Sequence, residues 1–147
     1  MKGIKPENQM RVCSPSRSIN ESLARSLAAA FAALADPTVE ELCDIKTAVS
    51  EAVTNAIVHG YRDTLGVVYI TAALYPGGRV IITIRDRGCG IADIQKAREP
   101  LYTTCTTGER AGLGFAVMEE LMDKVKVRSK VGEGTIVTME RVLKSRE

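Results

Sequence analysis

Residues 67–90, VVYITAALYPGGRVIITIRDRGCG, predict a β-hairpin that ends in a glycine-rich turn. The runs 67–75 and 79–85 are rich in β-branched residues, which favour strands. The Pro-Gly-Gly sequence between them is typical of a turn, so the two strands are expected to pair with each other. Asp86 and the glycines that follow it predict a tight turn at the end of the second strand.

Further strands are predicted on both sides of this hairpin. Residues 8–13 show some alternation of polarity and predict a short strand. Residues 125–129 and 135–142 predict a second hairpin, whose turn is the Val-Gly-Glu-Gly sequence of residues 131–134.

Two long helices are predicted between the first strand and the first hairpin. Apolar residues at helical spacing predict a helix that begins at Ser18 and ends at residues 36–37, Asp-Pro. A second helix is predicted over 39–59, and Gly60 is its expected stop. Each helix begins with the spacing of a capping box, Ser18 with Glu21 and Thr38 with Glu41.

Three more segments are predicted between the two hairpins. Residues 92–98 predict a short helix, and residues 112–122 predict a longer one. Residues 99–111 are polar, contain four threonines, and predict a mobile loop.

Apart from the short helix at 92–98, the predicted order of elements is β-α-α-β-β-α-β-β, which favours an α+β fold. Strands paired by hairpins, with the helices elsewhere in the chain, predict a two-layer α/β sandwich. Its sheet is expected to be mixed and mostly antiparallel, with the helices on one face. At 147 residues, the chain is expected to be a single domain spanning 1–147.

Composition excludes several classes of function. The formal net charge is +2, from 20 basic and 18 acidic residues, which argues against direct binding of nucleic acid. No run of about 18 apolar residues is present, so we expect no membrane span and a cytoplasmic location. The spacing of the four cysteines matches no zinc motif.

The second predicted helix carries a polar stripe among apolar neighbours. Glu51, Asn55 and His59 are four residues apart and therefore share one helical face. An asparagine carbonyl is a suitable ligand for Mg²⁺ that also binds phosphate oxygens, and a glutamate one turn away could accept a proton. The alternative is a polar stripe that faces solvent or a partner.

Two glycine-rich segments could complete a nucleotide site. Asp86 could accept a hydrogen bond from an exocyclic amine, such as that of adenine, while Gly88 and Gly90 let the backbone lie against a flat ring. Residues 112–114, Gly-Leu-Gly, begin a predicted helix whose free N–H groups favour phosphate. The preceding loop offers hydroxyl groups and an arginine as further donors. The alternatives are an ordinary strand-ending turn and a flexible connection; a P-loop is excluded, because its motif is absent.

The three segments resemble, in order, the N, G1 and G2 boxes of the GHKL superfamily, which includes gyrase, histidine kinases and MutL. Residues 20–25 (NESLAR), 36–38 (DPT), 45–57 (IKTAVSEAVTNAI) and 109–115 (ERAGLGF) further resemble the sporulation anti-sigma F factor family. This resemblance extends from about residue 9 to residue 143.

The resemblance implies a fold, an activity and partners. The fold would be the Bergerat ATP-binding sandwich of the GHKL superfamily. The chain would sequester sigma factor F and, as a protein-serine/threonine kinase, would phosphorylate a serine of the anti-anti-sigma factor with ATP and Mg²⁺, leaving ADP. Members of the family are homodimers.

The resemblance also implies roles for particular residues. Glu51 would be the general base, Asn55 would ligate Mg²⁺, and Asp86 would bind the adenine amine with support from Thr135. Arg25 would contact a partner. The remaining positions would shape the adenine pocket, the phosphate site and the lid, namely Gly88, Gly90, Thr103, Thr104, Arg110, Gly112, Leu113 and Gly114.

Two alternatives to this function remain open from the sequence. The chain could be a module that sequesters a sigma factor in response to ATP without kinase activity. It could also be the related stress-response switch kinase, which acts on another sigma factor.

Overall fold

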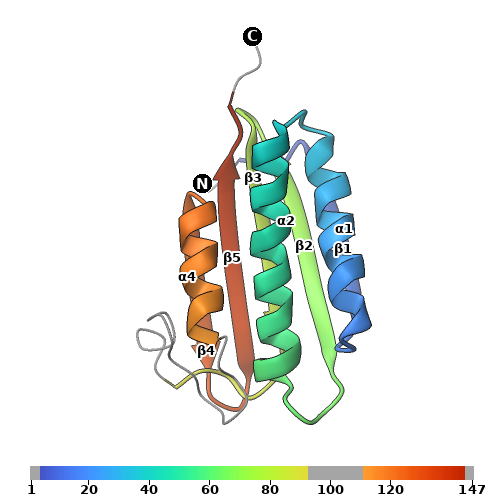
Figure 1. Ribbon diagram of the computed structural model, residues 1–147, viewed down its shortest axis with the longest axis vertical. Helices are drawn as coiled ribbons and strands as arrows, with labels where there is room; N and C mark the ends of the chain where they lie inside the picture. The colour runs from blue at the N-terminus through green and yellow to red at the C-terminus, as the bar shows by residue number, and fades with distance from the viewer. Residues whose placement is uncertain (1–3, 93–110, 145–147) are drawn as a thin grey trace.

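The computed structural model describes residues 4–92 and 111–144, and it has a five-stranded sheet (Figure 1). The spatial order of the strands is β1-β2-β3-β5-β4, and each neighbouring pair is antiparallel. The strands are β1 (Asn8–Pro15), β2 (Val67–Tyr75), β3 (Arg79–Asp86), β4 (Lys124–Lys130) and β5 (Gly134–Val142). Both predicted hairpins are therefore confirmed, and no end of their strands differs from its predicted position by more than one residue.

The α-helices of the described residues lie side by side over one face of the sheet, as Figure 1 shows. They are α1 (Ile19–Ala33), α2 (Val39–Thr54) and α4 (Ala111–Leu121), and a π-helix, η1 (Asn55–Gly60), continues α2. The helix α2 occupies the middle of this layer and packs against both α1 and α4. The predicted two-layer α+β sandwich is thus confirmed.

The core lies between the two layers because both carry one apolar face. On β3, Val80, Ile82 and Ile84 alternate with more exposed residues, and each is almost completely buried. On α2, Ile45 and Val49 are four residues apart and fully buried. Burying each such side chain stabilises the fold by roughly 1.5–3 kcal/mol, so this interface fixes how α2 lies on the sheet.

The capping box at the start of α2 is confirmed. The hydroxyl group of Thr38 accepts a hydrogen bond from the Glu41 N–H, and the Glu41 carboxylate accepts one from the Thr38 N–H. Glu41 is buried and also accepts a hydrogen bond from the Lys144 N–H, 2.9 Å away. This one side chain therefore joins the start of α2 to the segment after β5.

The capping box predicted at the start of α1 is wrong. Ser18 makes no side-chain capping bond. The Glu21 carboxylate instead accepts a hydrogen bond from the hydroxyl group of Ser50 on α2, and it lies 3.4 Å from the guanidinium group of Arg25. A tertiary contact between α1 and α2 has replaced the local bond that the spacing suggested.

The predicted helix over 39–59 is present, but its last part is not α-helical. After Thr54 the backbone widens into the π-helix η1, which closes with a hydrogen bond from the Tyr61 N–H to the Ala56 carbonyl oxygen. Single π-helical turns are frequent at functional sites. This one contains Asn55 and His59, two of the residues of the predicted polar stripe.

The short helix predicted at 92–98 and the loop predicted at 99–111 lie outside the described residues except for their outermost positions, of which Ala111 belongs to α4 and not to a loop. In the part of the chain that the structure describes, no helix combines the length and the apolar character needed to cross a membrane.

Candidate functional site

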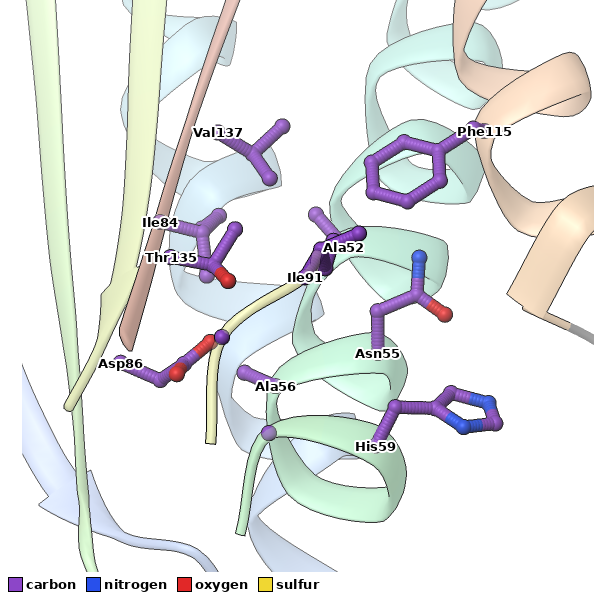
Figure 2. Close-up of a pocket in the computed structure, with 12 residues that line it drawn as sticks. Ala52, Asn55, Ala56, His59, Ile84, Asp86, Ile91, Phe115, Thr135 and Val137 are labelled. Atoms are coloured by element: carbon purple, nitrogen blue, oxygen red, sulfur yellow. The ribbon is translucent and has the colours of Figure 1, made fainter. Parts of the chain in front are cut away.

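A cleft opens between the sheet and the helical layer, where β3 ends and α4 begins (Figure 2). In Figure 2, Asp86 and Thr135 lie on the strand side of this cleft, while Asn55 lies on the helix side and Phe115 comes from α4. Its lining residues are Ala52, Asn55, Ala56, His59, Gly60, Ile84, Asp86, Gly90, Ile91, Phe115, Thr135 and Val137. The lining is thus apolar around a few polar groups, as is usual for small-molecule sites.

Asp86 is the buried carboxylate of the cleft, with 6% of its surface exposed. Burial raises the pKa of Asp86 above its usual range, although hydrogen bonds from the N–H groups of Gly88 and Thr135 act in the opposite direction. Because an ionised aspartate is only an acceptor, its remaining lone pairs can bind a donor such as an exocyclic amine.

Glycines let three backbone segments close around Asp86. A Cβ atom on Gly60 would lie 2.8 Å from the Asp86 carboxyl carbon, so only glycine leaves room for the carboxylate there. A Cβ atom on Gly88 would lie 1.9 Å from the Gly60 carbonyl oxygen. Gly90 has a φ of +77° and packs against the backbone of Lys130. Gly88 and Gly90 were both predicted to shape the adenine pocket, and of these two Gly90 lines the cleft.

The start of α4 brings the first and third predicted segments together. A Cβ atom on Gly114 would lie 3.0 Å from the Asn55 amide nitrogen and 3.3 Å from a carboxylate oxygen of Glu51. Gly112 and Leu113 lie in the first turn of the same helix. The helix N-terminus, with its free N–H groups, therefore lies beside Asn55 and Glu51, an arrangement that suits phosphate.

Asn55 has a side chain whose bonding is incomplete. Among the described residues, its amide nitrogen is buried and has no hydrogen-bond partner. Because the oxygen and nitrogen of an amide are assigned rather than observed, this atom position can equally hold the carbonyl oxygen. Leaving such a group unsatisfied costs about 1–3 kcal/mol, so the position favours a ligand in the cleft.

The surroundings of Asn55 fit a Mg²⁺ ion that is bound together with phosphates better than a metal ion whose ligands all come from the protein. The described residues contain no group of three or more His, Cys, Asp or Glu side chains arranged to bind a metal ion. Mg²⁺ usually keeps several waters and is bound through one or two protein oxygens together with substrate phosphates. An asparagine and a glutamate beside the N-terminus of α4 match that chemistry.

Ser129 on β4 was not identified from the sequence. Its hydroxyl group accepts a hydrogen bond from the Ile91 N–H at 2.7 Å and lies 2.8 Å from the hydroxyl group of Thr135. The register places Thr135 opposite both Ser129 and Asp86. No sequence motif marks Ser129, because its role depends on pairing between two strands and a distant loop.

The other predicted residues lie away from the cleft or outside the described residues. Arg25 is on α1, where it pairs with Glu21. Glu51 lies close to Gly114, since a Cβ atom there would be 3.3 Å from its carboxylate oxygen, but it is not among the residues that line the cleft. Thr103, Thr104 and Arg110, the predicted lid residues, lie outside the described residues.

Comparison with known proteins is consistent with this geometry. The family model described as "Histidine kinase-like ATPase domain" matches residues 15–141. An anti-sigma F factor of Thermoanaerobacter sp. is 51% identical over 138 residues, covering 94% of this chain and 96% of the relative. An anti-sigma F factor of Anoxybacillus flavithermus is 53% identical over 133 residues, covering 90% of each chain.

Solved structures share the fold at lower identity. The crystal structure of the RsbU and RsbW domains of a Mycobacterium tuberculosis protein matches with a TM-score of 0.69 and 23% identity, covering 94% of this chain and 32% of that one. A blue-light activated histidine kinase of Erythrobacter litoralis matches with a TM-score of 0.59 and 24% identity, covering 80% of this chain and 40% of that one. This chain thus corresponds to less than half of either solved chain. On the strength of the family model and the relatives above half identity, the chain belongs to the histidine kinase-like ATPase domain family and, within it, to the anti-sigma F factors.

Proposed function

We propose that the chain is a cytoplasmic, single-domain anti-sigma factor that sequesters sigma factor F. As an ATP-dependent protein-serine kinase, it would also phosphorylate and inactivate the anti-anti-sigma factor. The observation that carries the proposal is the close approach of Gly114 to Glu51 and to Asn55, whose amide nitrogen is unsatisfied among the described residues. It supports a metal–phosphate site next to a potential general base.

The nucleotide would be bound from both sides of the cleft. The Asp86 carboxylate would accept a hydrogen bond from the adenine amine, and Thr135 would support it from the neighbouring strand. Gly88 and Gly90 would shape the wall against which the base lies. The N–H groups of Gly112, Leu113 and Gly114 would bind phosphate oxygens, with Thr103, Thr104 and Arg110 as further donors.

Asn55 and Glu51 would serve the phosphoryl transfer. Asn55 would hold Mg²⁺, which neutralises phosphate charge when bound. Glu51 lies one turn earlier on α2 and would accept the proton of the attacking serine hydroxyl group. Positioning and charge neutralisation supply most of the catalysis in such reactions, so two well-placed side chains are sufficient.

The surface of α1 is suited to a protein partner. Ile19 and Leu23 expose 77% and 49% of their surface one turn apart, close in sequence to Arg25. Exposed apolar side chains and arginines are both frequent in interfaces between proteins. We assign this surface to sigma factor F, bound by a homodimer of the chain.

A phosphorylation assay tests the kinase. The purified chain would be mixed with Mg²⁺, ATP labelled at the γ-phosphate, and the anti-anti-sigma protein of the same organism. We expect label on a serine of that protein, and we expect Glu51→Gln to lower the rate at least a hundredfold while ATP still binds.

The matched control is Glu40→Gln, which alters an exposed glutamate at the start of the same helix and should leave the rate unchanged. Unchanged phosphorylation by Glu51→Gln would remove Glu51 from the base role. Absence of label with wild-type protein that still binds ATP and sigma factor would favour the nucleotide-dependent sequestering module.

A further inference from the structure

We infer that Ser129 is a positioning residue that sets which purine base the cleft accepts, because it holds the hydroxyl group of Thr135 as a hydrogen-bond acceptor. The inference rests on the proposed binding of a purine nucleotide and extends it to base selection. Ser129 belongs to β4, an edge strand that contributes no residue to the lining of the cleft.

Ser129 contacts both walls of the base end of the cleft. Its hydroxyl group accepts a hydrogen bond from the N–H of Ile91, which follows the glycine-rich loop and lines the cleft. The same oxygen lies 3.0 Å from the Gly134 carbonyl oxygen and 2.8 Å from the hydroxyl oxygen of Thr135. Thr135 has 7% of its surface exposed and is also a cleft residue.

These three contacts can all be made at once in only one arrangement of protons. A serine hydroxyl group has one proton and two lone pairs. Since the Gly134 carbonyl oxygen can only accept, the Ser129 proton must point to it. One lone pair of Ser129 then takes the Ile91 N–H, and the other takes the proton of the Thr135 hydroxyl group.

The Thr135 hydroxyl group, having given its proton to Ser129, presents lone pairs to the cleft. Asp86 lies opposite Thr135 across β3 and β5, and its carboxylate also only accepts when ionised. The base end of the cleft therefore presents acceptors from two strands. A purine with an amine at position 6 brings a donor to the acceptor that faces this position, whereas a purine with a carbonyl there brings a repelling lone pair to the same acceptor and keeps a donor only at N1.

The test compares the dissociation constants of ATP and of inosine triphosphate, which carries a carbonyl in place of the amine. We expect the wild-type chain to prefer ATP. In Ser129→Ala the Thr135 hydroxyl group is free to turn and donate its own proton. The ratio of the two constants should then fall about three- to tenfold, the equivalent of one neutral hydrogen bond.

Three further variants separate base selection from mere loss of structure. Ser129→Thr keeps the hydroxyl group and should keep the wild-type ratio. Ser14→Ala removes a serine on β1, the other edge strand, and should also keep it. In a Thr135→Val background, Ser129→Ala should cause no further change in the ratio.

Several results would overturn the inference. Equal weakening of ATP and inosine triphosphate in Ser129→Ala would show a structural role without base selection. A ratio unchanged in folded Ser129→Ala, as judged by circular dichroism, would show no role at all. A wild-type chain that binds neither nucleotide would instead contradict the proposed function itself. The titration of the wild-type chain with ATP separates this outcome from a failure of the inference about Ser129.

Discussion

The chemistry of the cleft depends on polar side chains that are buried although the protein itself does not satisfy all of their hydrogen bonds. Asp86 has 6% of its surface exposed, and Asn55 has a buried amide nitrogen without a partner among the described residues. Burying such groups costs free energy unless hydrogen bonds compensate for it. The fold supplies part of this compensation to Asp86, through the N–H groups of Gly88 and Thr135, and leaves the rest for a ligand.

The raised pKa of Asp86 predicts how nucleotide binding depends on pH. The pKa of Asp86 in the folded chain lies above its usual value of 3.8. Ionising Asp86 therefore opposes folding as the pH rises from 3.8 through the raised pKa. Only the ionised form is a pure acceptor for the adenine amine. We therefore expect ATP affinity to fall on acidification at a pH already above 3.8, as measured by calorimetric titration.

The phosphates of ATP also titrate, so the pH series needs a reference. Asp86→Asn retains the shape of the side chain without its titration, and its weaker ATP binding should vary with pH only as the phosphates require. A wild-type pH profile parallel to that of Asp86→Asn would contradict the assignment of Asp86 as the acceptor.

The residues of the cleft could be predicted from the sequence only where they belong to a continuous motif. Asn55, Asp86 and Gly114 each stand in a short segment whose residue types suit a particular chemistry. Ser129 belongs to no such segment, since its partners, Ile91 and Thr135, are brought to it by the sheet register and the loop. Hydrogen-bond partners that are distant in sequence leave no periodic signal.

At the scale of elements, the site depends on how closely α4 approaches the end of α2. The two helices pack together, and Gly114 allows the start of α4 to lie directly against Asn55 and Glu51. The π-helical turn η1 begins at the same Asn55. A widened turn on one helix and a glycine on the other thus lie together at the place where phosphates would bind.

Gly114→Ala is predicted to separate stability from binding. Alanine is favoured over glycine within a helix by about 0.5–1 kcal/mol, which offsets the close contacts of the added methyl group. The free energy of unfolding should therefore change by less than about 1 kcal/mol in urea denaturation. ATP affinity should fall at least tenfold, because the methyl group displaces the side chains of Asn55 and Glu51.

A matched control for this variant is Gly77→Ala in the first hairpin, where an added Cβ atom meets nothing within 4 Å. Its ATP affinity shows the effect of an added methyl group away from the cleft. Its free energy of unfolding should fall somewhat, because a φ of +85° is strained for alanine. Wild-type ATP affinity in Gly114→Ala would show that the start of α4 does not contribute to the nucleotide site.

The limits of elements were predictable where local interactions decide them. The hairpins have strong turn sequences, and the Thr38–Glu41 capping box forms as its spacing suggests. The equally spaced Ser18 and Glu21 do not form one, because Glu21 contacts Ser50 and Arg25 instead. The π-helix was not predictable either, since Gly60 must pack against Asp86 from a distant strand.

For the whole molecule, the sandwich gathers three distant segments at one end. The antiparallel sheet brings the end of β3 beside the start of β5, and the helices on its covered face bring η1 and the start of α4 to the same end (Figure 1). On the described residues the helices lie on one face of the sheet, so the cleft opens where the two layers part. The two-layer class followed from the order of predicted elements, whereas the order of strands in the sheet did not.

Two features join the layers at the opposite end. Arg141 on β5 donates to the carboxylate of Asp44 on α2 at 2.8 Å and also to the Leu121 carbonyl oxygen at the end of α4. Glu41 accepts the N–H of Lys144. These contacts fix α2 and α4 to the sheet at the end opposite the cleft, so the cleft can retain unsatisfied polar groups without loss of the fold.

The central claim is that this cleft binds ATP through Asp86, and equilibrium titration of Asp86→Asn with ATP in the presence of Mg²⁺ tests it most directly. Loss of a hydrogen bond to a charged group predicts an affinity about ten- to a hundredfold weaker than wild type. Asp63→Asn, at an exposed position in the turn before β2, should bind ATP as the wild-type chain does. Equal affinities for wild type and folded Asp86→Asn would contradict the account, because the nucleotide would then bind elsewhere or not by its base.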